Sequence, residues 1–333
     1  MKVLLTGGTG FLGKNVARHL VASGHEVRLL ARATSDLRGL PAGLDVVHGD
    51  VTDGAGFTAA AAGCAAVMHM AAVVKMWTPD RAEFDRVNVG GLQHALAAAR
   101  AAHARLVYTS SFIAVGPTGS APVDESHVHD QQRFRNDYER TKARADVLAR
   151  EAAEAGQDVV LLYPGVVYGP GELTAANIVV KMVCDHLSGR LPALVGPGDR
   201  LWSYAFADDV ARAHVSALER GRAGQRYFLG GENVTLRDFF ARLETLTGVP
   251  APRRHIPYGV ASMVGRALHL WAELTGAVPE LTHEVVNVFR EHWAYESGKA
   301  ASELEYRSRP LADGLKVTLD WLHERALVPA RAS

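Results

Sequence analysis

The chain begins with a short apolar run that leads directly into a glycine-rich turn and then into a helical pattern. Val3–Leu5 is apolar, and Thr6–Gly13 reads Thr-Gly-Gly-Thr-Gly-Phe-Leu-Gly. Apolar residues then recur at helical spacing as far as Gly24, and a second apolar run begins at Val27. A buried strand, a tight glycine turn and an amphipathic helix in this order are typical of a dinucleotide-binding βαβ unit.

The glycines of this turn have separate physical roles in such a unit. Gly7 permits the tight turn, Gly10 lets the backbone approach a pyrophosphate, and Gly13 lets the helix pack close to the strand. The free N–H groups at the start of the helix favour an anionic ligand. The cofactor-binding residues predicted in this turn are Gly7, Thr9, Gly10, Phe11, Leu12 and Gly13.

The first half of the chain alternates short β-rich runs with longer helical patterns. Strands are expected at Val3–Leu5, Val27–Leu30, Val46–His48, Val67–Met70, Leu106–Thr109 and Val159–Leu162, and helices at Ala82–Ala102 and Tyr138–Ala155. This alternation predicts an α/β fold: a Rossmann, doubly wound parallel sheet covered on both faces. After Pro164 the pattern loosens and later becomes mainly helical, which predicts a smaller C-terminal substrate domain.

The expected domain boundaries follow this change of pattern. Residues 1–165 are expected to form the dinucleotide-binding Rossmann domain, completed by about residues 201–231. Residues 166–200 and 232–333 are expected to form the mainly helical, substrate-binding part. A chain of 333 residues is long enough for one large α/β domain and a smaller one.

Two segments of the second half carry specific expectations. One aspartate of Asp208-Asp209 is expected to cap a helix. The most apolar stretch, Ile256–Val278, contains an arginine, a histidine and a glutamate, so it is a poor transmembrane helix and no integral membrane segment is expected. We expect a helix that faces the core, with an interfacial helix that admits a lipophilic substrate as the alternative.

Charge and cysteine content exclude several functional classes. Lysine plus arginine equals aspartate plus glutamate, 36 each, so no nucleic-acid partner is expected. Cys64 and Cys184 lie far apart without metal-ligand spacing, and no export signal precedes the first strand, so a reducing, cytoplasmic location is expected. His127 and His129 lack a third nearby ligand, which predicts a solvated loop and no metal site.

Three residues form the predicted catalytic set. Tyr138 and Lys142 lie four residues apart in an expected helix and therefore share one face. An ammonium beside a phenol lowers the phenol's pKa from about 10, which suits a general acid/base acting on a hydroxyl or carbonyl. Ser111 follows the fifth expected strand, at the sheet edge where ligands bind, and its hydroxyl suits a hydrogen bond to a substrate oxygen.

Together these motifs resemble the extended (atypical) branch of the short-chain dehydrogenase/reductase family, of the NAD-dependent epimerase/dehydratase type. The resemblance covers nearly the whole chain and rests on Thr6–Gly13, Gly49-Asp50, His69–Ala72, Asn88–Gly91, Thr109–Ser111, Tyr138–Lys142, Tyr163–Pro170 and Asp208–Val210. Within that branch the chain is similar to dihydroflavonol reductase-like enzymes, especially the farnesol dehydrogenase-like and hopanoid-associated epimerase-like groups. That narrower likeness rests on Tyr163–Asn177, Gly189–Pro192 and Arg307–Pro310.

The resemblance implies roles for the matching positions. Tyr138 would be the acid/base, Lys142 would hold the nicotinamide ribose and tune Tyr138, and Ser111 would orient the substrate carbonyl. Asn88 would support Lys142 indirectly or act as a packing residue. The implied cofactor-binding residues are Asp50 and Val51 at the adenine, Ala71 and Ala72 in the nucleotide cleft, and Pro164, Gly165 and Val167 by the nicotinamide. A homodimer through the helices Ala82–Ala102 and Tyr138–Ala155 is also implied.

The end of the second expected strand bears on the choice of cofactor. NAD sites usually place an acidic residue there, about 20 residues after the glycine turn, to bind the ribose 2′-OH. This chain has Ala31-Arg32 instead, and an arginine would accept a 2′-phosphate, so NADP(H) is favoured and NAD(H) is the alternative. Asp36 comes later in the chain, in an expected turn. The farnesol dehydrogenase resemblance, in contrast to Arg32, implies NAD.

The residues expected to border the substrate are mostly apolar, with simple packing as the alternative interpretation for each. The predicted substrate-binding residues are Val74, Trp77, Phe112 and Leu173, with Met76 and Phe134 nearby. An apolar pocket suits a hydrophobic alcohol, ketone or aldehyde. We therefore expect an NAD(P)-dependent oxidoreductase that transfers hydride between nicotinamide and such a small molecule.

Two other functions stay open from the sequence. A nucleotide-sugar epimerase or dehydratase with tightly bound NAD would need paired cations for the sugar's diphosphate, and Arg190 and Arg200 are the candidates. A non-catalytic dinucleotide-sensing protein could share the fold, because a fold alone does not imply activity. The complete set of Ser111, Tyr138 and Lys142 argues against this last reading.

Overall fold

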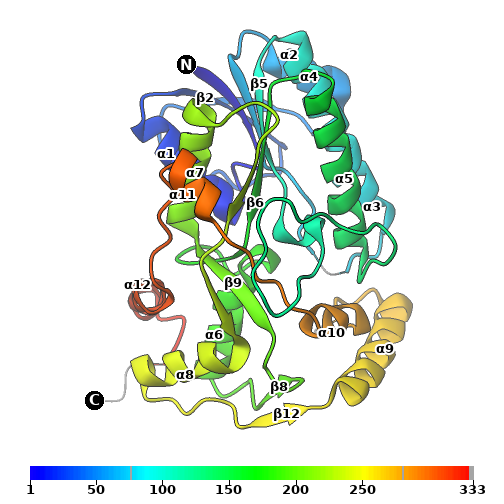
Figure 1. The fold of residues 1–333 in the computed structure, drawn as a ribbon, viewed down its shortest axis with the longest axis vertical. Coiled ribbons are helices and arrows are strands. Elements are labelled where there is room, and N and C mark those ends of the chain that lie inside the picture. Colours follow the sequence, from blue (N-terminus) through cyan, green and yellow to red (C-terminus); the bar gives the residue numbers. More distant parts are fainter. Residues whose placement is uncertain (76, 280, 330–333) are drawn as a thin grey trace.

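A seven-stranded parallel sheet forms the centre of the larger part of the molecule (Figure 1). The computed structural model describes residues 1–75, 77–279 and 281–329. In spatial order the strands are β10 (Arg226–Leu229), β6 (Val159–Pro164), β5 (Arg105–Thr109), β4 (Ala66–His69), β1 (Lys2–Thr6), β2 (Glu26–Ala31) and β3 (Asp45–His48). All six strands expected in the first half are present, each within two residues of its predicted bounds. The predicted doubly wound α/β fold is confirmed.

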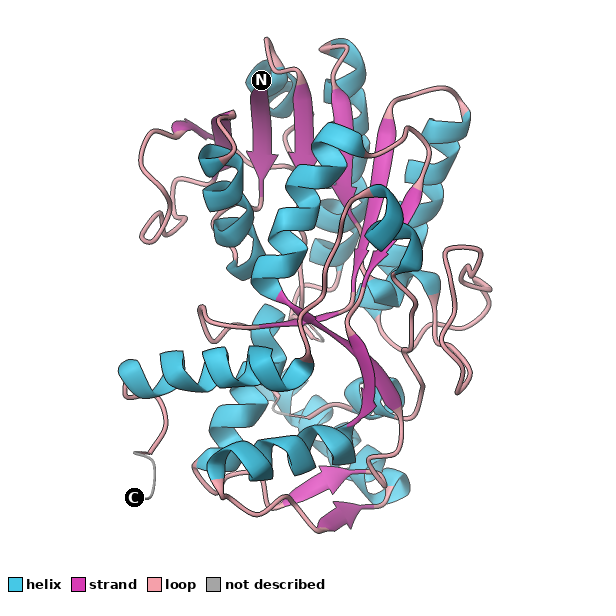
Figure 2. Cartoon of the chain, turned by 60° about the vertical axis from the view of Figure 1, so that its left-hand side comes forward, coloured by secondary structure: helices cyan, strands magenta, loops and turns pink. Residues whose placement is uncertain are grey.

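Helices cover both faces of this sheet (Figure 2). The helices on one face are α2 (Gly54–Ala61), α4 (Gly91–Ala101) and α5 (Asp137–Glu154); those on the other are α1 (Phe11–Ala22), α7 (Ala207–Arg220) and the short α11 (Gly298–Glu303). Strands buried on both faces explain why their sequences are continuous apolar runs rather than alternating ones. The six residues of β6, for example, are all buried.

The expected helix Ala82–Ala102 is built from three consecutive segments. A short α3 (Ala82–Phe84) passes into a π-helical turn, η1 (Asp85–Gly90), which continues as α4. Single π-helical turns inside helices are frequent at functional sites. This turn brings the buried Asn88 against the strand ends.

The C-terminal part is mainly helical, as predicted. Its helices are α6 (Ile178–Leu187), α8 (Leu236–Thr247), α9 (Tyr258–Thr275), α10 (His283–Phe289) and α12 (Leu311–Glu324), with a short 3-10 turn, η3 (Ala175–Asn177). Two small sheets accompany them: β11 (Glu232–Thr235), β9 (Leu201–Phe206) and β7 (Val166–Tyr168), and β12 (Arg254–Ile256) with β8 (Ala193–Val195). A separate apolar core that includes Tyr204, Phe239 and Leu315 joins α6, α8 and α12 to β7, β8, β9 and β11.

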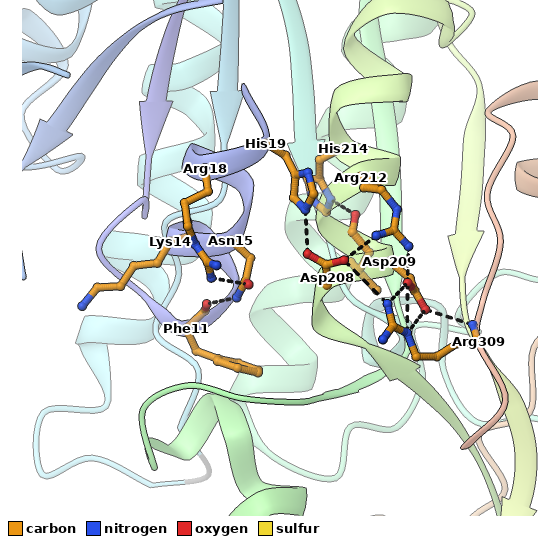
Figure 3. Close-up of polar contacts among 11 residues, drawn as sticks. Phe11, Lys14, Asn15, Arg18, His19, Asp208, Asp209, Arg212, His214 and Arg309 are labelled. Carbon is orange, nitrogen blue, oxygen red and sulfur yellow. Dashed lines mark hydrogen bonds and ion pairs between the residues drawn. The ribbon is translucent and has the colours of Figure 1, made fainter. Parts of the chain in front are cut away.

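The two aspartates at the start of α7 do not cap the helix, so that prediction is wrong. The N-cap position is Phe206, and both carboxylates lie in the first helical turn. Figure 3 shows them turned toward other segments: Asp208 contacts His19 of α1 at 2.7 Å, and the buried Asp209 accepts a hydrogen bond from the Arg309 backbone N–H at 2.9 Å. Because the helix begins at Ala207, neither aspartate occupies the cap position, and their charge-assisted bonds to distant partners tie α1, α7 and the segment before α12 together.

The expectation of a core-facing helix at Ile256–Val278 is also wrong in its orientation. The helix is present as α9, but its large apolar side chains point to solvent, and Leu274 is 84% exposed. The fully buried residues of α9 are small, namely Ala261, Gly265 and Ala272, and a Cβ on Gly265 would come within 2.6 Å of the His283 backbone nitrogen. None of the described helices is long and apolar enough to cross a bilayer.

Candidate active site

A cavity of about 640 Å³ lies at the carboxyl ends of the parallel strands. The strand order of the sheet changes direction between β1 and β4, and ligands of open α/β sheets bind at such a switch point. One end of the cavity is lined by the glycine turn and the end of β2. The other end is lined by residues of η2 (Phe112–Val115), β9 and α10.

The glycine turn forms a cradle that fits a pyrophosphate. A Cβ on Gly7, which has a φ of 71°, would lie 2.6 Å from the Ala71 nitrogen, and one on Gly13 would overlap the Gly7 carbonyl. A Cβ on Gly10, in contrast, would make only an ordinary 3.4 Å contact with the Gly7 carbonyl oxygen; Gly10 lines the cavity, and α1 begins directly after it. All six residues predicted here line the cavity: Gly7, Thr9, Gly10, Phe11, Leu12 and Gly13. The backbone N–H groups at the start of α1 are therefore suited to bind the pyrophosphate of a dinucleotide.

The remaining predicted cofactor residues line the same cavity. These are Arg32, Asp50, Val51, Ala71, Ala72, Pro164, Gly165 and Val167. One oxygen of Asp50 accepts hydrogen bonds from the Thr52 backbone N–H and hydroxyl, at 2.9 and 2.8 Å. Those bonds orient the carboxylate at the end of the cavity that an adenine would occupy.

The residues after β2 present a cation to the cavity. Arg32 is exposed and forms no ion pair with any residue that the structure describes. Asp36 is not among the described lining residues; it pairs with Arg38 at 2.7 Å, and that pair holds the Asp36 pKa below its ordinary value. A 2′-phosphate at this place would meet an unpaired guanidinium rather than a carboxylate.

The three predicted catalytic residues all line this cavity. Ser111 follows β5 and begins η2, while Tyr138 and Lys142 lie on the first turns of α5, where Asn136 caps the helix by accepting from the Glu139 N–H at 2.8 Å. All three line the cavity and are buried, Tyr138 at 7% and Lys142 at 2% exposure. A hydrogen bond between Ser111 and Tyr138 acts to lower the pKa of the phenol.

The electrostatics of this group differ from the sequence expectation. Burial raises the pKa of Tyr138 to about 12, so its net shift is opposite to the lowering that the sequence predicts from Lys142. The Lys142 ammonium instead donates to the Thr109 carbonyl at 3.0 Å and to the Tyr108 hydroxyl at 3.3 Å. Burial also lowers the pKa of Lys142 to about 7, because a charge away from water is costly, and Asp146 opposes that shift.

Asn88 joins one wall of the cavity to α5. Its side-chain carbonyl accepts from the Val73 N–H at 2.8 Å, and its amide donates to the Thr141 hydroxyl at 3.1 Å. Val73 lines the cavity, and Thr141 precedes Lys142 in the chain. Asn88 is therefore a positioning residue for both the cavity wall and the helix that carries Lys142.

The predicted substrate residues divide into two groups. Val74 and Phe112 line the cavity, whereas Trp77 and Leu173 are not among its described lining residues, and Leu173 is 42% exposed. Phe134 stacks on His129 with ring centroids 4.8 Å apart, and Met76 lies outside the described residues. All four substrate assignments stay predictions.

Sequence reasoning missed residues of the apolar end that come from distant segments. Trp202 on β9 and Val285, Val288 and Phe289 on α10 line the cavity there. The spacing of the three α10 residues indicates one helix face, but nothing local shows which face meets the cavity. Tyr108, which contacts Lys142, was also missed, although it stands directly before the singled-out Thr109.

The arginines considered for a sugar diphosphate bind elsewhere. Arg190 pairs with Asp185 at 2.9 Å, and Arg200 donates to His292 at 2.9 Å. Among the lining residues that the structure describes, Arg32 is the single arginine, and it lies at the nucleotide end. The charged residues of the apolar end, Lys75 and Glu83, approach each other to 3.9 Å.

The loop with two histidines is more structured than expected. No group of potential metal ligands occurs among the described residues. The expectation of a solvated loop is wrong for His129, whose side chain is 1% exposed and contacts Glu139 of α5 at 2.9 Å. Arg135 approaches the same carboxylate at 2.7 Å, because a fully buried Glu139 needs several donors.

The fold and this site together define the class of the protein, an oxidoreductase of the short-chain dehydrogenase/reductase type. The chain belongs to the NAD dependent epimerase/dehydratase family, whose model matches residues 3–230. A Synechocystis sp. protein that carries the name dihydroflavonol 4-reductase is 33% identical, covering 97% of this chain and 95% of that protein. A 2-alkyl-3-oxoalkanoate reductase of Stenotrophomonas maltophilia is 31% identical, covering 88% and 91%.

Solved structures agree with this assignment. The structure of a dTDP-glucose 4,6-dehydratase double mutant from Streptomyces venezuelae, with NAD and DAU bound, superposes with a TM-score of 0.73 at 26% identity. The match covers 97% of each chain. The sequence-based expectation of this family is confirmed.

Proposed function

We propose that the protein reduces the carbonyl of a hydrophobic small molecule, or oxidises the corresponding alcohol, with NADP(H) as the preferred cofactor. The observation that carries this proposal is the apolar end of the cavity, which adjoins Ser111, Tyr138 and Lys142; its described lining residues include no arginine pair for a diphosphate. In the proposed division of labour, residues 1–165 and 201–231 hold the cofactor. Residues 166–200 and 232–333 then shape the substrate end, together with Phe112 and Trp202 of the first part.

The chain's own residues would handle the proton and the orientation of the substrate. The nicotinamide, when bound, supplies or accepts the hydride at the substrate carbon. With its pKa near 12, the Tyr138 phenol keeps its proton at neutral pH and can donate it to the carbonyl oxygen during reduction; oxidation returns that proton. Ser111 would hydrogen-bond the same substrate oxygen, and Lys142 would hold the nicotinamide ribose.

Replacing the proposed acid/base tests the reaction. Tyr138→Phe removes the phenolic proton and keeps the ring, so turnover of aromatic ketones or prenyl aldehydes should fall about 10²- to 10⁴-fold. Fluorescence titration should show unchanged NADPH binding. Full activity of Tyr138→Phe would refute the assignment, and a wild type that binds NADPH without turning over any carbonyl or UDP-sugar would favour the sensing alternative.

The proposed cofactor preference rests on Arg32 and on the engagement of Asp36 by Arg38. Arg32→Ala should weaken NADPH binding by about tenfold or more, because a charge-assisted bond to the 2′-phosphate is lost, and should leave NADH binding unchanged. Arg325→Ala is the matched control, since Arg325 is exposed, directly follows α12 and is not among the described residues that line the cavity. Equal affinity of the wild type for NADH and NADPH would overturn this preference while leaving the reductase proposal intact.

A nucleotide-sugar epimerase or dehydratase is the second candidate. It is favoured by the structural similarity to a dehydratase with NAD bound. Retained NAD in the purified protein and conversion of a UDP-sugar without net reduction would establish it in place of the reductase.

We also propose a homodimer built on the η1–α4 and α5 helices, in a reducing, cytoplasmic setting. Both cysteines are free and buried, in agreement with that setting. Sedimentation at micromolar concentration should show the dimer, and a monomer there would remove this part of the proposal.

A further inference from the structure

A continuous apolar stripe runs along the exposed side of α9. Its residues recur every three or four positions and are all exposed: Val260, Met263, Val264, Ala267, Leu270, Trp271 and Leu274. Leu270 is 61% exposed, Trp271 63% and Leu274 84%. Apolar residues at helical spacing normally face a core, and a monomer rarely exposes a contiguous stripe of this kind.

The opposite side of α9 fixes this orientation. Ala261, Gly265 and Ala272 are buried, and Gly265 sits against the backbone at Thr282 and His283. A larger residue on that side would clash, so the helix cannot turn its large side chains inward. Figure 1 shows α9 beside α10 at the outer edge of the molecule, away from the seven-stranded sheet.

Cations border the stripe. Arg253 and Arg254 precede the helix and Arg266 flanks the stripe; all three are exposed and form no ion pair with any described residue. Glu273, in contrast, contacts His269 at 3.2 Å. Leucine and tryptophan on one side with arginines at the margin are typical of helices that lie in a membrane interface.

From these observations we propose that α9 docks the protein on an anionic lipid bilayer surface, with its apolar stripe among the acyl chains and Arg253, Arg254 and Arg266 at the phosphates. The structure gives this surface a connection to the cavity. Val285, Val288 and Phe289 of α10 line the apolar end of the cavity, and α10 packs directly on α9. Resting on the proposed function, this arrangement would let a membrane-dissolved carbonyl or alcohol reach the site beside the lipid surface.

Vesicle binding tests the docking surface without any need for turnover. The full chain is mixed with vesicles of phosphatidylcholine, alone or with phosphatidylglycerol, and the bound fraction is measured by flotation. Binding should be stronger to the anionic vesicles. Leu270→Gln and Leu274→Gln should each weaken it about tenfold, and the pair Arg253→Ser and Arg254→Ser about fivefold per arginine on anionic vesicles alone.

Val317→Gln is the matched control, because Val317 is an exposed valine, 42%, on α12. It should leave vesicle binding unchanged. Absence of wild-type binding to either vesicle, or equal binding by the α9 variants, would overturn the proposal. So would a dimer in lipid-free sedimentation that Leu274→Gln dissociates, since the stripe would then contact a second copy of the chain. Failure of the reductase assay leaves the vesicle result unaffected.

Discussion

Two helices of equal length, α5 and α9, depart in opposite ways from the usual distribution of polar and apolar side chains. Each spans 18 residues, yet α5 buries Glu139, Lys142 and Asp146, whereas α9 exposes its leucines and its tryptophan. An ordinary surface helix of a globular protein would do neither. The buried charged residues of α5 lie where the candidate catalytic group is. The exposed apolar residues of α9 form the proposed lipid-facing stripe.

The energetic costs of these two departures differ. A buried charge is stable only when it is paired or hydrogen-bonded, so α5 depends on partners from loops and strands. Exposed apolar residues cost little in the folded monomer, because the unfolded chain exposes them as well. The comparison teaches that α5 is held by tertiary contacts, whereas the surface of α9 is free to serve an external partner.

Among the changes that test this comparison, the largest loss of stability is expected from replacing Glu139. Glu139→Ala removes the acceptor that His129 and Arg135 share, leaving a buried imidazole and a mostly buried guanidinium without that partner, so the free energy of unfolding should fall by about 3–5 kcal/mol. Urea unfolding measures it. Glu151→Ala, an exposed position on the same helix, should change it by less than about 0.5 kcal/mol. Equal effects of the two variants would contradict the role of buried partners in α5.

The second effect is a pH dependence from Lys142. Its pKa is lowered from 10.5 to about 7, so between these values the unfolded chain binds a proton that the folded chain releases. Stability from this group therefore rises with pH through that window and is lost as pH falls toward 7. Between pH 7 and 10 the free energy of unfolding of the wild type should rise relative to that of Lys142→Met. A constant difference across this range would show that Lys142 stays protonated when buried, aided by Asp146.

The smallest effect is expected on α9. Leu274→Gln should change the free energy of unfolding by less than about 0.5 kcal/mol, since the side chain is 84% exposed. Leu319→Ala on α12, where the leucine is 2% exposed, should cost about 2–5 kcal/mol in the same thermal or urea measurement. A comparable loss for Leu274→Gln would mean that the stripe packs against the protein itself.

Local patterns in the sequence determined much of the nucleotide half. Apolar runs predict buried parallel strands, and the glycine spacing predicts the phosphate cradle, because both depend on residues adjacent in the chain. The positions of Ser111, Tyr138 and Lys142 could be predicted for the same reason: a strand end and one helix face determine them. Arg32, the cation proposed to bind the cofactor, likewise could be singled out from the sequence because it directly follows β2.

Only the tertiary structure decided which surfaces meet. Periodicity marks an apolar face on α9 but cannot state whether that face meets a core, and the small residues of its other side decided the orientation. The Lys142 ammonium is directed to Tyr108 and Thr109, and Asp209 to Arg309, through contacts between segments distant in sequence. The apolar end of the cavity joins β9 and α10 to the strand ends in the same way. Burial and long-range partners set these energies, and both arise only when the chain is folded.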